Sequence, residues 1–239
     1  MIRARENPED VLAIVNRRHG AALRLSGPDP GGDTHAAKII EDDAGRRMLL
    51  KWSSGAEFRA ADAAALASRL RAAGYPIAEF LYWGVEGAIS YTVRPWIEGR
   101  VLGAELPRYL DRVLALNDLQ AGVAPDLTGG FRQTLLASVL EGFGDWCVLD
   151  SLRNHSARSA NLLAELQEIV RRSARAAMRM DDAVHWDFHH GNILIDDGGI
   201  AAVIDWEGCR DTGTDSARFL AAGAKRSFWL RTKQGFLAE

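Results

Sequence analysis

Three side chains that can bind a metal ion or accept a proton lie near one another in the C-terminal half of the sequence: Asp187, Asn192 and Asp205. Between the last two, short apolar runs flank the pair Gly198 and Gly199. Two glycines at the centre of a two-residue loop are typical of a type I′ β-hairpin, because both central residues need positive φ angles. The sequence therefore predicts a hairpin between Asn192 and Asp205.

A hairpin centred on these two glycines determines which residues face one another. Asp197 would face Ile200, and Asn192 would face Asp205 at the open end. The loop that carries Asp187 comes just before Asn192, so it can fold over the same end. An amide oxygen and two carboxylates gathered at one point form a set of hard oxygen ligands that suits Mg²⁺.

The composition is that of an ordinary folded protein. The chain has 239 residues, of which 47% are hydrophobic and 26% are charged, and its formal net charge is -3. This length allows one large domain or two smaller lobes that share a cleft. The small net charge predicts no nucleic-acid partner, and the lack of a long apolar run predicts no membrane segment.

Two features predict a cytoplasmic protein. Residues 1–7 contain no apolar core of a signal peptide. Cys147 and Cys209 belong to no Cys-x-x-Cys motif, which fits reduced thiols better than a structural zinc site or a disulfide framework. The sequence does not decide between a monomer and a homodimer.

The elements that must position the candidate residues begin with a helix, which Asn7 and Pro8 start and Gly20 ends. Strands are predicted over residues 21–26, 34–41, 47–52, 79–83 and 89–93, and a second helix over residues 56–73. A glycine-bearing loop over residues 27–33 joins the first two strands, and its backbone N–H groups can approach a phosphate. Lys51 lies near the end of the third strand, among apolar neighbours.

The second part of the chain is mostly helical. Pro95 and Gly99 mark a connector over residues 95–99, which divides an N-lobe over residues 1–94 from a C-lobe over residues 100–239. Helices are predicted over residues 106–120, 131–150, 158–180 and 215–222. The expected fold class is α+β, with an antiparallel sheet and a helix in the N-lobe and a mostly helical C-lobe that contains the hairpin.

The order of these motifs resembles one known family. The strand lysine, a helix acid and the connector are followed by His185-Trp186-Asp187-Phe188-His189-His190-Gly191-Asn192-Ile193-Leu194 and by Ile204-Asp205-Trp206. These runs resemble the His-Gly-Asp-x-x-x-x-Asn-Ile-Leu and Ile-Asp-Trp signatures of the aminoglycoside phosphotransferase family. Leu70–Pro76 and Gly213-Thr214-Asp215 resemble two further segments of it. The resemblance implies a bilobal protein-kinase-like fold.

The resemblance also implies roles for individual residues. Asp187 would be the catalytic carboxylate that orients, and can deprotonate, the acceptor hydroxyl. Asn192 and Asp205 would hold Mg²⁺ on the phosphates of ATP. Lys51 would contact the α- and β-phosphates.

Two parts of the nucleotide site are also implied. Lys51 would pair with an acid on the helix over residues 56–73, where Asp62 is favoured over Glu57. The backbone of the connector would hydrogen-bond adenine; the residues concerned are Arg94, Trp96 and Ile97.

The implied reaction moves the γ-phosphoryl group of ATP to a hydroxyl of a small molecule. Such a reaction needs positioning and neutralisation of phosphate charge more than covalent chemistry. The acceptor would be an aminoglycoside-like antibiotic, as in antibiotic resistance, or a hydroxylated metabolite. A cationic antibiotic would need an acidic pocket wall, for which the candidates are Glu141, Asp145, Asp150, Glu207 and Asp211. The sequence does not separate ATP from GTP.

Two alternatives remain open. The histidines His185, His189 and His190 beside Asp187 could form a zinc site, although their order differs from the His-x-His-x-Asp-His pattern of metallo-hydrolases. The chain could also be a catalytically weak kinase-like protein that binds nucleotide.

Overall fold

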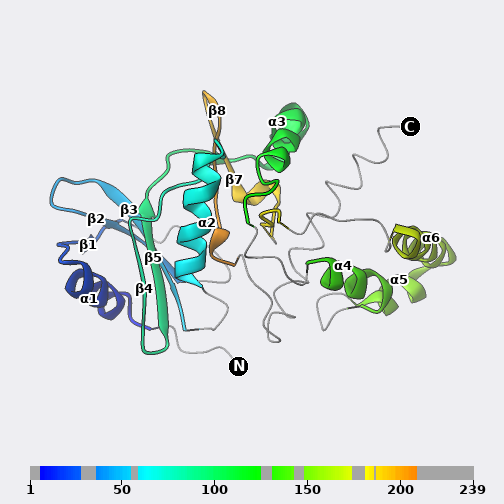
Figure 1. Cartoon of the computed structure of the whole chain (residues 1–239), viewed down its shortest axis with the longest axis horizontal. Coiled ribbons are helices and arrows are strands. Elements are labelled where there is room, and N and C mark those ends of the chain that lie inside the picture. Colours follow the sequence, from blue (N-terminus) through cyan, green and yellow to red (C-terminus); the bar gives the residue numbers. More distant parts are fainter. Residues whose placement is uncertain are drawn as a thin grey trace. The chain divides into compact units, whose positions relative to one another are not determined.

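The computed structural model describes residues 6–27, 36–54, 59–124, 131–142, 148–173, 181–185 and 187–208. The described residues fall into two compact units: a first unit within Met1–Arg108 and His190–Gly208, and a second within Tyr109–His189. The first unit contains two antiparallel sheets with helices, and the second is mostly helical, which confirms the α+β class (Figure 1). This division differs from the predicted lobes, which placed the hairpin with the C-terminal helices.

The first helix, α1 (Pro8–His19), has the predicted ends. The side chain of Asn7 accepts a hydrogen bond from the backbone N–H of Glu9 at 3.2 Å. Gly20 follows the helix at a φ of 61°, a left-handed conformation that glycine adopts without a steric cost. The buried face of α1 comprises Val11, Leu12 and Val15.

A five-stranded antiparallel sheet follows, in the order β1-β2-β3-β5-β4. Its strands are β1 (Arg24–Leu25), β2 (Ala36–Glu41), β3 (Arg47–Ser53), β4 (Tyr82–Glu86) and β5 (Ile89–Pro95). Across β3 and β5, Lys51 pairs with Thr92, and Leu49 pairs with Arg94. This register decides which side chains share a face of the sheet.

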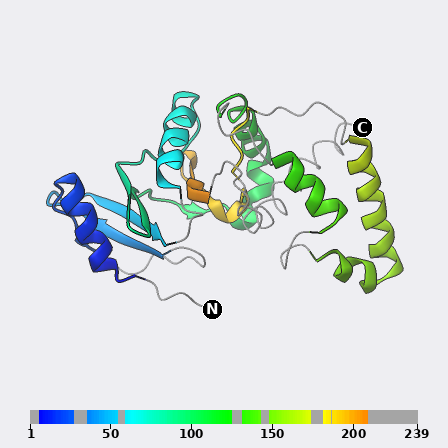
Figure 2. The same ribbon diagram turned by 60° about the horizontal axis from the view of Figure 1, so that its bottom comes forward.

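The two faces of this sheet differ in chemistry. On one face, Leu50, Tyr91 and Val93 belong to the apolar core that includes α1. On the other face, β5 contributes the buried polar residues Thr92 and Arg94. Successive side chains of a strand point to opposite faces, so Lys51 shares the polar face with Thr92. Helix α2 (Ala60–Ala72) lies on this side of the sheet and α1 on the other (Figure 2).

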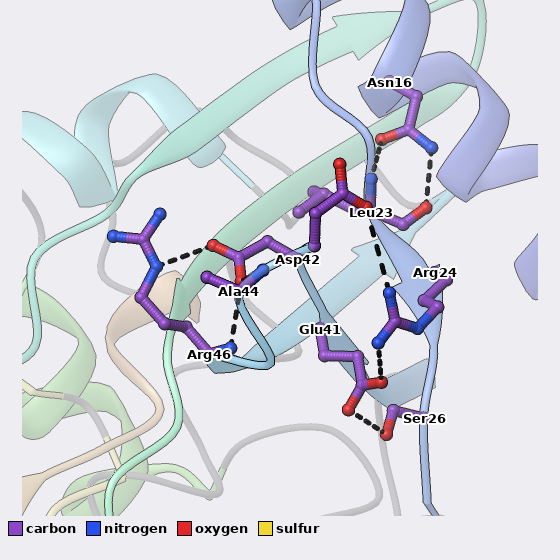
Figure 3. Close-up of polar contacts among 9 residues, drawn as sticks. Asn16, Leu23, Arg24, Ser26, Glu41, Asp42, Ala44 and Arg46 are labelled. Atoms are coloured by element: carbon purple, nitrogen blue, oxygen red, sulfur yellow. Dashed lines mark hydrogen bonds and ion pairs between the residues drawn. The ribbon is translucent and has the colours of Figure 1, made fainter.

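Polar side chains fasten the edge strand β1 and the residues beside it to the neighbouring strand β2 and to α1 (Figure 3). The amide of Asn16 donates to the carbonyl of Leu23 at 2.8 Å and accepts from its N–H at 2.9 Å, as a neighbouring strand would. Glu41 accepts a hydrogen bond from the hydroxyl of Ser26 at 2.7 Å and pairs with Arg24 at 2.5 Å. The Ser26 hydrogen bond, followed by the Arg24 contacts, holds the pKa of the Glu41 carboxyl below its ordinary value.

A second sheet, in the order β6-β7-β8, belongs to the same unit. Its strands are β6 (Arg100–Val101), β7 (Ile193–Asp196) and β8 (Gly199–Val203), and the short 3-10 helices η3 (His190–Asn192) and η4 (Trp206–Gly208) flank the hairpin. The backbone N–H of Val203 donates to the carbonyl of Pro76 at 2.7 Å. The ring of Trp206 packs edge-on against Tyr75, with centroids 5.4 Å apart. These contacts attach the hairpin to the chain that leaves α2.

The hairpin is present, but its turn differs from the prediction. Asp196 pairs with Gly199, so the central residues are Asp197 and Gly198 and not the two glycines. Neither central residue has a positive φ, which excludes a type I′ turn. The predicted turn is wrong because the side chain of Asp196 accepts hydrogen bonds from Gly198 at 2.8 Å and from Gly199 at 3.0 Å.

The remaining described elements are helices. They are η1 (Gly103–Glu105), α3 (Leu106–Asp118), α4 (Phe131–Leu140), α5 (Leu149–His155) and α6 (Ala157–Ser173). The single helix predicted over residues 131–150 is wrong, because α4 stops before Gly142, whose φ is 85°, and α5 is a separate helix. The side-chain amide of Gln167 on α6 donates to the carbonyls of Val139 and Leu140 at 3.0 and 3.2 Å, at the end of α4.

Some predictions concern residues that the structure does not describe. The helix over residues 215–222, most of the loop over residues 27–33 and the residues Glu57, Asp145 and Asp211 lie outside the described residues. Within the described part of the chain, no helix is both long and apolar enough to cross a membrane.

Candidate functional site

The candidate site of the first unit begins with Lys51 on β3, whose side chain is 10% exposed. Its ammonium nitrogen Nζ lies 2.5 Å from Oδ1 of Asp205 and 3.5 Å from Oε2 of Glu207. The polar face of the sheet directs the lysine to this point. Burial of a charge is costly unless partners of opposite sign compensate it, and these two carboxylates do so.

The structure brings Asn192 and Asp205 to the open end of the hairpin, through a register that differs from the prediction. The last ladder pair is Ile193 with Val203, and the backbone N–H of Ile204 donates to the carbonyl of Asn192 at 2.9 Å. Asn192 therefore lies opposite Ile204, and Asp205 is the next residue. Asn192 is buried, whereas the side chain of Asp205 is 34% exposed.

Asp205 also has an unusual backbone. Among the described residues other than glycine, it alone has a positive φ, of 71°. Aspartate and asparagine adopt left-handed backbone more readily than other side chains, but single instances still carry strain. Such residues are retained where the surrounding structure fixes them, often at functional sites. Here the conformation occurs where β8 has ended and the carboxylate meets Lys51.

Glu207 is the residue of this site that the sequence did not reveal. As a candidate for an acidic acceptor wall it would be exposed, but the structure buries it completely. Its Oε1 accepts a hydrogen bond from the hydroxyl of Thr92 at 3.3 Å. Burial acts to raise the pKa of this carboxyl, but the charges of Lys51 and Arg94 outweigh it, so the pKa lies below its ordinary value. One signal was available, because polar residues (Ser90, Thr92 and Arg94) alternate with apolar ones along β5, and all three are buried.

The predicted pair between Lys51 and Asp62 is absent from the described structure. Asp62 lies in the first turn of α2, where its carboxylate is 2.5 Å from the guanidinium of Arg59. The carboxylates that reach the ammonium come instead from the chain after the hairpin. Asp62 has a cation of its own on the same helix turn, and the other candidate, Glu57, lies outside the described residues.

Asp187 belongs to the second unit, where its side chain is 44% exposed. Its Oδ2 lies 3.4 Å from Nε2 of His189, and its backbone N–H donates to the carbonyl of His185. The ring of His185 is buried against Phe188, with centroids 5.9 Å apart. Within the described ranges, no three His, Cys, Asp or Glu side chains are placed to hold a metal ion together. The zinc alternative thus has no supporting cluster in that part of the chain.

The predicted adenine contacts lie at the end of β5. Arg94 is paired with Leu49 in the ladder, and its side chain is buried. The backbone N–H of Trp96 donates to the carbonyl of Arg47 at 3.0 Å, so this donor is already used. Ile97 follows beyond the ladder, in the connector.

Together, the first unit gathers one ammonium and two carboxylates where β3 and β5 meet the end of the hairpin, and the buried Asn192 lies opposite the residue before Asp205. Hard oxygen ligands of this kind bind a divalent cation. A nearby ammonium is suited to phosphate oxygens. The arrangement therefore suits a phosphate-bearing ligand with a bound metal ion.

Several solved structures share this fold over nearly the whole chain. The crystal structure of the aminoglycoside phosphotransferase APH(4)-Ia is 19% identical at a TM-score of 0.57, covering 97% of this chain and 85% of that chain. A thermostable mutant of that enzyme, in a ternary complex with ADP and hygromycin B, is 19% identical at a TM-score of 0.56, covering 96% and 84%. An aminoglycoside phosphotransferase from Alicyclobacillus acidocaldarius is 21% identical at a TM-score of 0.50, covering 95% and 74%. These similarities confirm the predicted kinase-like fold.

No curated protein sequence is significantly similar to the chain. The family model described as the phosphotransferase enzyme family, abbreviated APH, matches residues 28–224. This range includes the strand lysine, the connector and the hairpin with its flanking motifs. The predicted resemblance is therefore confirmed, and the chain belongs to the phosphotransferase enzyme family.

Proposed function

We propose that this phosphotransferase moves the γ-phosphoryl group of ATP to a hydroxyl group of a small molecule, with Mg²⁺ as cofactor. The observation that carries the proposal is the convergence of Lys51, Asp205 and Asn192 at the end of the hairpin, in a chain of this family. Structures of the same fold that hold hygromycin B with ADP or with AMP-PNP support a nucleotide and a hydroxylated acceptor.

The residues at the hairpin end fit a magnesium ion. The carboxylate of Asp205 and the amide oxygen of Asn192 are hard ligands, and Mg²⁺ is usually held by one or two carboxylates together with phosphates and waters. The side chain of Asp205 is 34% exposed, so a cation can reach it. A bound magnesium ion would neutralise charge on the transferring phosphoryl group. Asn192 and Asp205 would hold it there.

The other residues of the chain position the reactants. Lys51 binds the α- and β-phosphates, and the backbone of Ile97 in the connector hydrogen-bonds adenine. Asp187 orients the acceptor hydroxyl and accepts its proton. Loss of one such preorganised group typically lowers kcat by about 10²- to 10³-fold.

The acceptor is an aminoglycoside-like antibiotic or a hydroxylated metabolite. Of the predicted acidic wall, Glu141 and Asp150 are exposed, and Asp150 pairs with Arg153 at 2.8 Å. Glu207 is buried and cannot contribute. A cytoplasmic location, where ATP is abundant, and a role in antibiotic resistance belong to the same proposal.

An ADP-release assay across aminoglycosides, peptide antibiotics and hydroxylated metabolites tests this function. We expect release that depends on one class of acceptor and on Mg²⁺, and that falls by about 10²- to 10³-fold in Asp187→Ala. Asp111→Asn, a change of an exposed carboxylate on α3, is the matched control and should leave the rate unchanged. Turnover that Asp187→Ala does not alter would remove Asp187 from the mechanism. Tight nucleotide binding without turnover on any acceptor would favour the catalytically weak alternative.

A further inference from the structure

Glu207 is a buried carboxylate that the proposed reaction does not yet use. It lies in η4, two residues after Asp205, and none of its surface is exposed. Carboxylates are rarely buried to this extent unless they are paired. Its polar surroundings are the ammonium of Lys51 at 3.5 Å, the hydroxyl of Thr92 at 3.3 Å and the charge of Arg94. A carboxylate in such surroundings is positioned to hold a cation.

The register of the main sheet explains why these groups meet. Lys51 pairs with Thr92 across β3 and β5, and Arg94 follows Thr92 by two residues on the same strand. Residues two apart on a strand share a face, and directly paired residues stand side by side on it. Lys51, Thr92 and Arg94 therefore form one polar strip. Glu207 contacts this strip from η4.

Apolar packing fixes the position of Glu207. The neighbouring ring of Trp206 is completely buried and packs edge-on against Tyr75 at an interplanar angle of 89°. Tyr75 is itself only 3% exposed. A carboxylate next to such an anchor has little conformational freedom left to lose when it binds a cation. Glu207 is thus preorganised as a partner for Lys51.

Asp205 and Glu207 contact the same ammonium but differ in access to solvent. Asp205 is closer, at 2.5 Å, and its side chain is 34% exposed. Glu207 has no exposed surface, so a hydrated cation does not reach it. We propose that Glu207, oriented by the hydroxyl of Thr92, is the positioning residue that holds Lys51 toward the nucleotide phosphates while Asp205 binds the metal. This inference rests on the proposed function.

Among the described residues, Lys51 therefore takes its carboxylate partners from the chain after the hairpin and not from α2. Asp62, the acid in the first turn of α2, is paired with Arg59 at 2.5 Å. Placement of the lysine then depends on two things: the docking of η4 and the strand residue opposite Lys51. Both can be changed without altering a residue proposed to bind metal.

Calorimetric titration with AMP-PNP and Mg²⁺ tests this role without turnover. Glu207→Gln keeps the shape of the side chain and removes its charge, and we expect the dissociation constant to rise about 10- to 100-fold, the size of effect typical of losing a hydrogen bond to a charged group. Thr92→Val removes only the hydroxyl and should raise the constant about 3- to 10-fold. Glu207→Asp retains the charge and should bind more tightly than Glu207→Gln.

Kinetics separate a positioning role from a general loss of structure. In Glu207→Gln, the KM for ATP should rise, while the Mg²⁺ concentration for half-maximal activity stays at the wild-type value because Asp205 and Asn192 are intact. Glu86→Gln is the control, since Glu86 is an exposed glutamate that pairs with Arg17 on α1. It should change neither quantity. If Glu207→Gln fails to fold, Thr92→Val decides the question.

Three results would overturn the assignment. A folded Glu207→Gln variant that binds AMP-PNP as tightly as the wild type would show that the carboxylate does not position Lys51. A raised Mg²⁺ requirement would make Glu207 a metal ligand. An equal loss of affinity in Asp62→Asn would return the partner of Lys51 to α2. Failure of the wild type itself to bind nucleotide would refute the proposed function instead.

Discussion

Removal of the Lys51 ammonium should destabilise the first unit far more than removal of a surface charge. Lys51→Met keeps an unbranched side chain but leaves Asp205 and Glu207 without their cation. Asp205 can regain water, because its side chain is 34% exposed, whereas Glu207 has no exposed surface. The cost therefore falls mainly on Glu207, with Arg94 as the remaining positive charge nearby.

The size of the effect follows from the burial. Loss of one partner of a buried ion pair costs about 3–5 kcal/mol. The lower end, about 3 kcal/mol, applies here because Arg94 still offsets part of the charge and the Lys51–Glu207 separation is long, at 3.5 Å. Glu207→Gln alone should cost about 2 kcal/mol, since Lys51 keeps Asp205. The double variant, Lys51→Met with Glu207→Gln, leaves neither the ammonium of Lys51 nor the carboxylate of Glu207 buried without the other. Its cost in unfolding free energy should therefore be smaller than the sum of the two single costs by at least about 1.5 kcal/mol.

Urea unfolding measures the unfolding free energies of the wild type, the two single variants and the double variant. Hydrogen exchange of the β3 and β5 amides reports the local effect. A loss of about 3 kcal/mol lowers Tm by about 6–12 °C in a protein of this size. Arg17→Met is the control: it breaks an exposed ion pair with Glu86 and should cost less than about 1 kcal/mol. A cost below about 1 kcal/mol for Lys51→Met, or single effects that add to within about 0.5 kcal/mol, would refute the reasoning.

Three further predictions concern the first unit. Ser26→Ala removes the largest cause of the low pKa of Glu41, so a carboxyl NMR titration should show that pKa rise; an unchanged value would contradict the contact. Burial is the main cause that lowers the pKa of His19, so its stabilising contribution is complete above about pH 6.5 and is lost as the pH falls through the folded pKa. The protection factors of the α1 amides, which are corrected for the intrinsic exchange rate at each pH, should fall over that range, and His19→Gln should abolish the trend. A Cβ at Gly84 would lie 2.7 Å from the hydroxyl oxygen of the buried Tyr91. Gly84→Ala should therefore cost about 1–3 kcal/mol in urea unfolding, and a cost near zero would show that the ring shifts freely.

Features that depend on neighbouring residues could be predicted from the sequence. The helix start at Asn7 and its end at Gly20 rest on capping chemistry within one turn, and both are confirmed. The hairpin rests on two apolar runs around glycine. Its turn was mispredicted because the side chain of Asp196 accepts hydrogen bonds from the backbone of both glycines, and the central residues are then Asp197 and Gly198.

The partner of Lys51 could not be predicted in the same way. Glu207 is 156 positions away, and only the register of β3 with β5 and the docking of η4 bring it to the ammonium. The family resemblance implied an acid of the predicted helix as the partner, and Asp62 was favoured among the two acids there. Its competitor Arg59, three positions earlier, neutralises it locally. The residue types in the sequence indicated the chemistry of the site, but the pairing of Lys51 with Glu207 depends on the folded sheet.

The first unit is built from two segments that are far apart in the sequence, and this has a consequence for synthesis on the ribosome. Lys51 is made 154 positions before Asp205. At a translation rate of about 5–20 residues per second, the carboxylates follow the lysine by about 8–30 s. During that interval the nascent β3–β5 pair carries a cation on its polar face without its anions. The sheet can then form early, but the polar side of this unit closes only when the hairpin emerges.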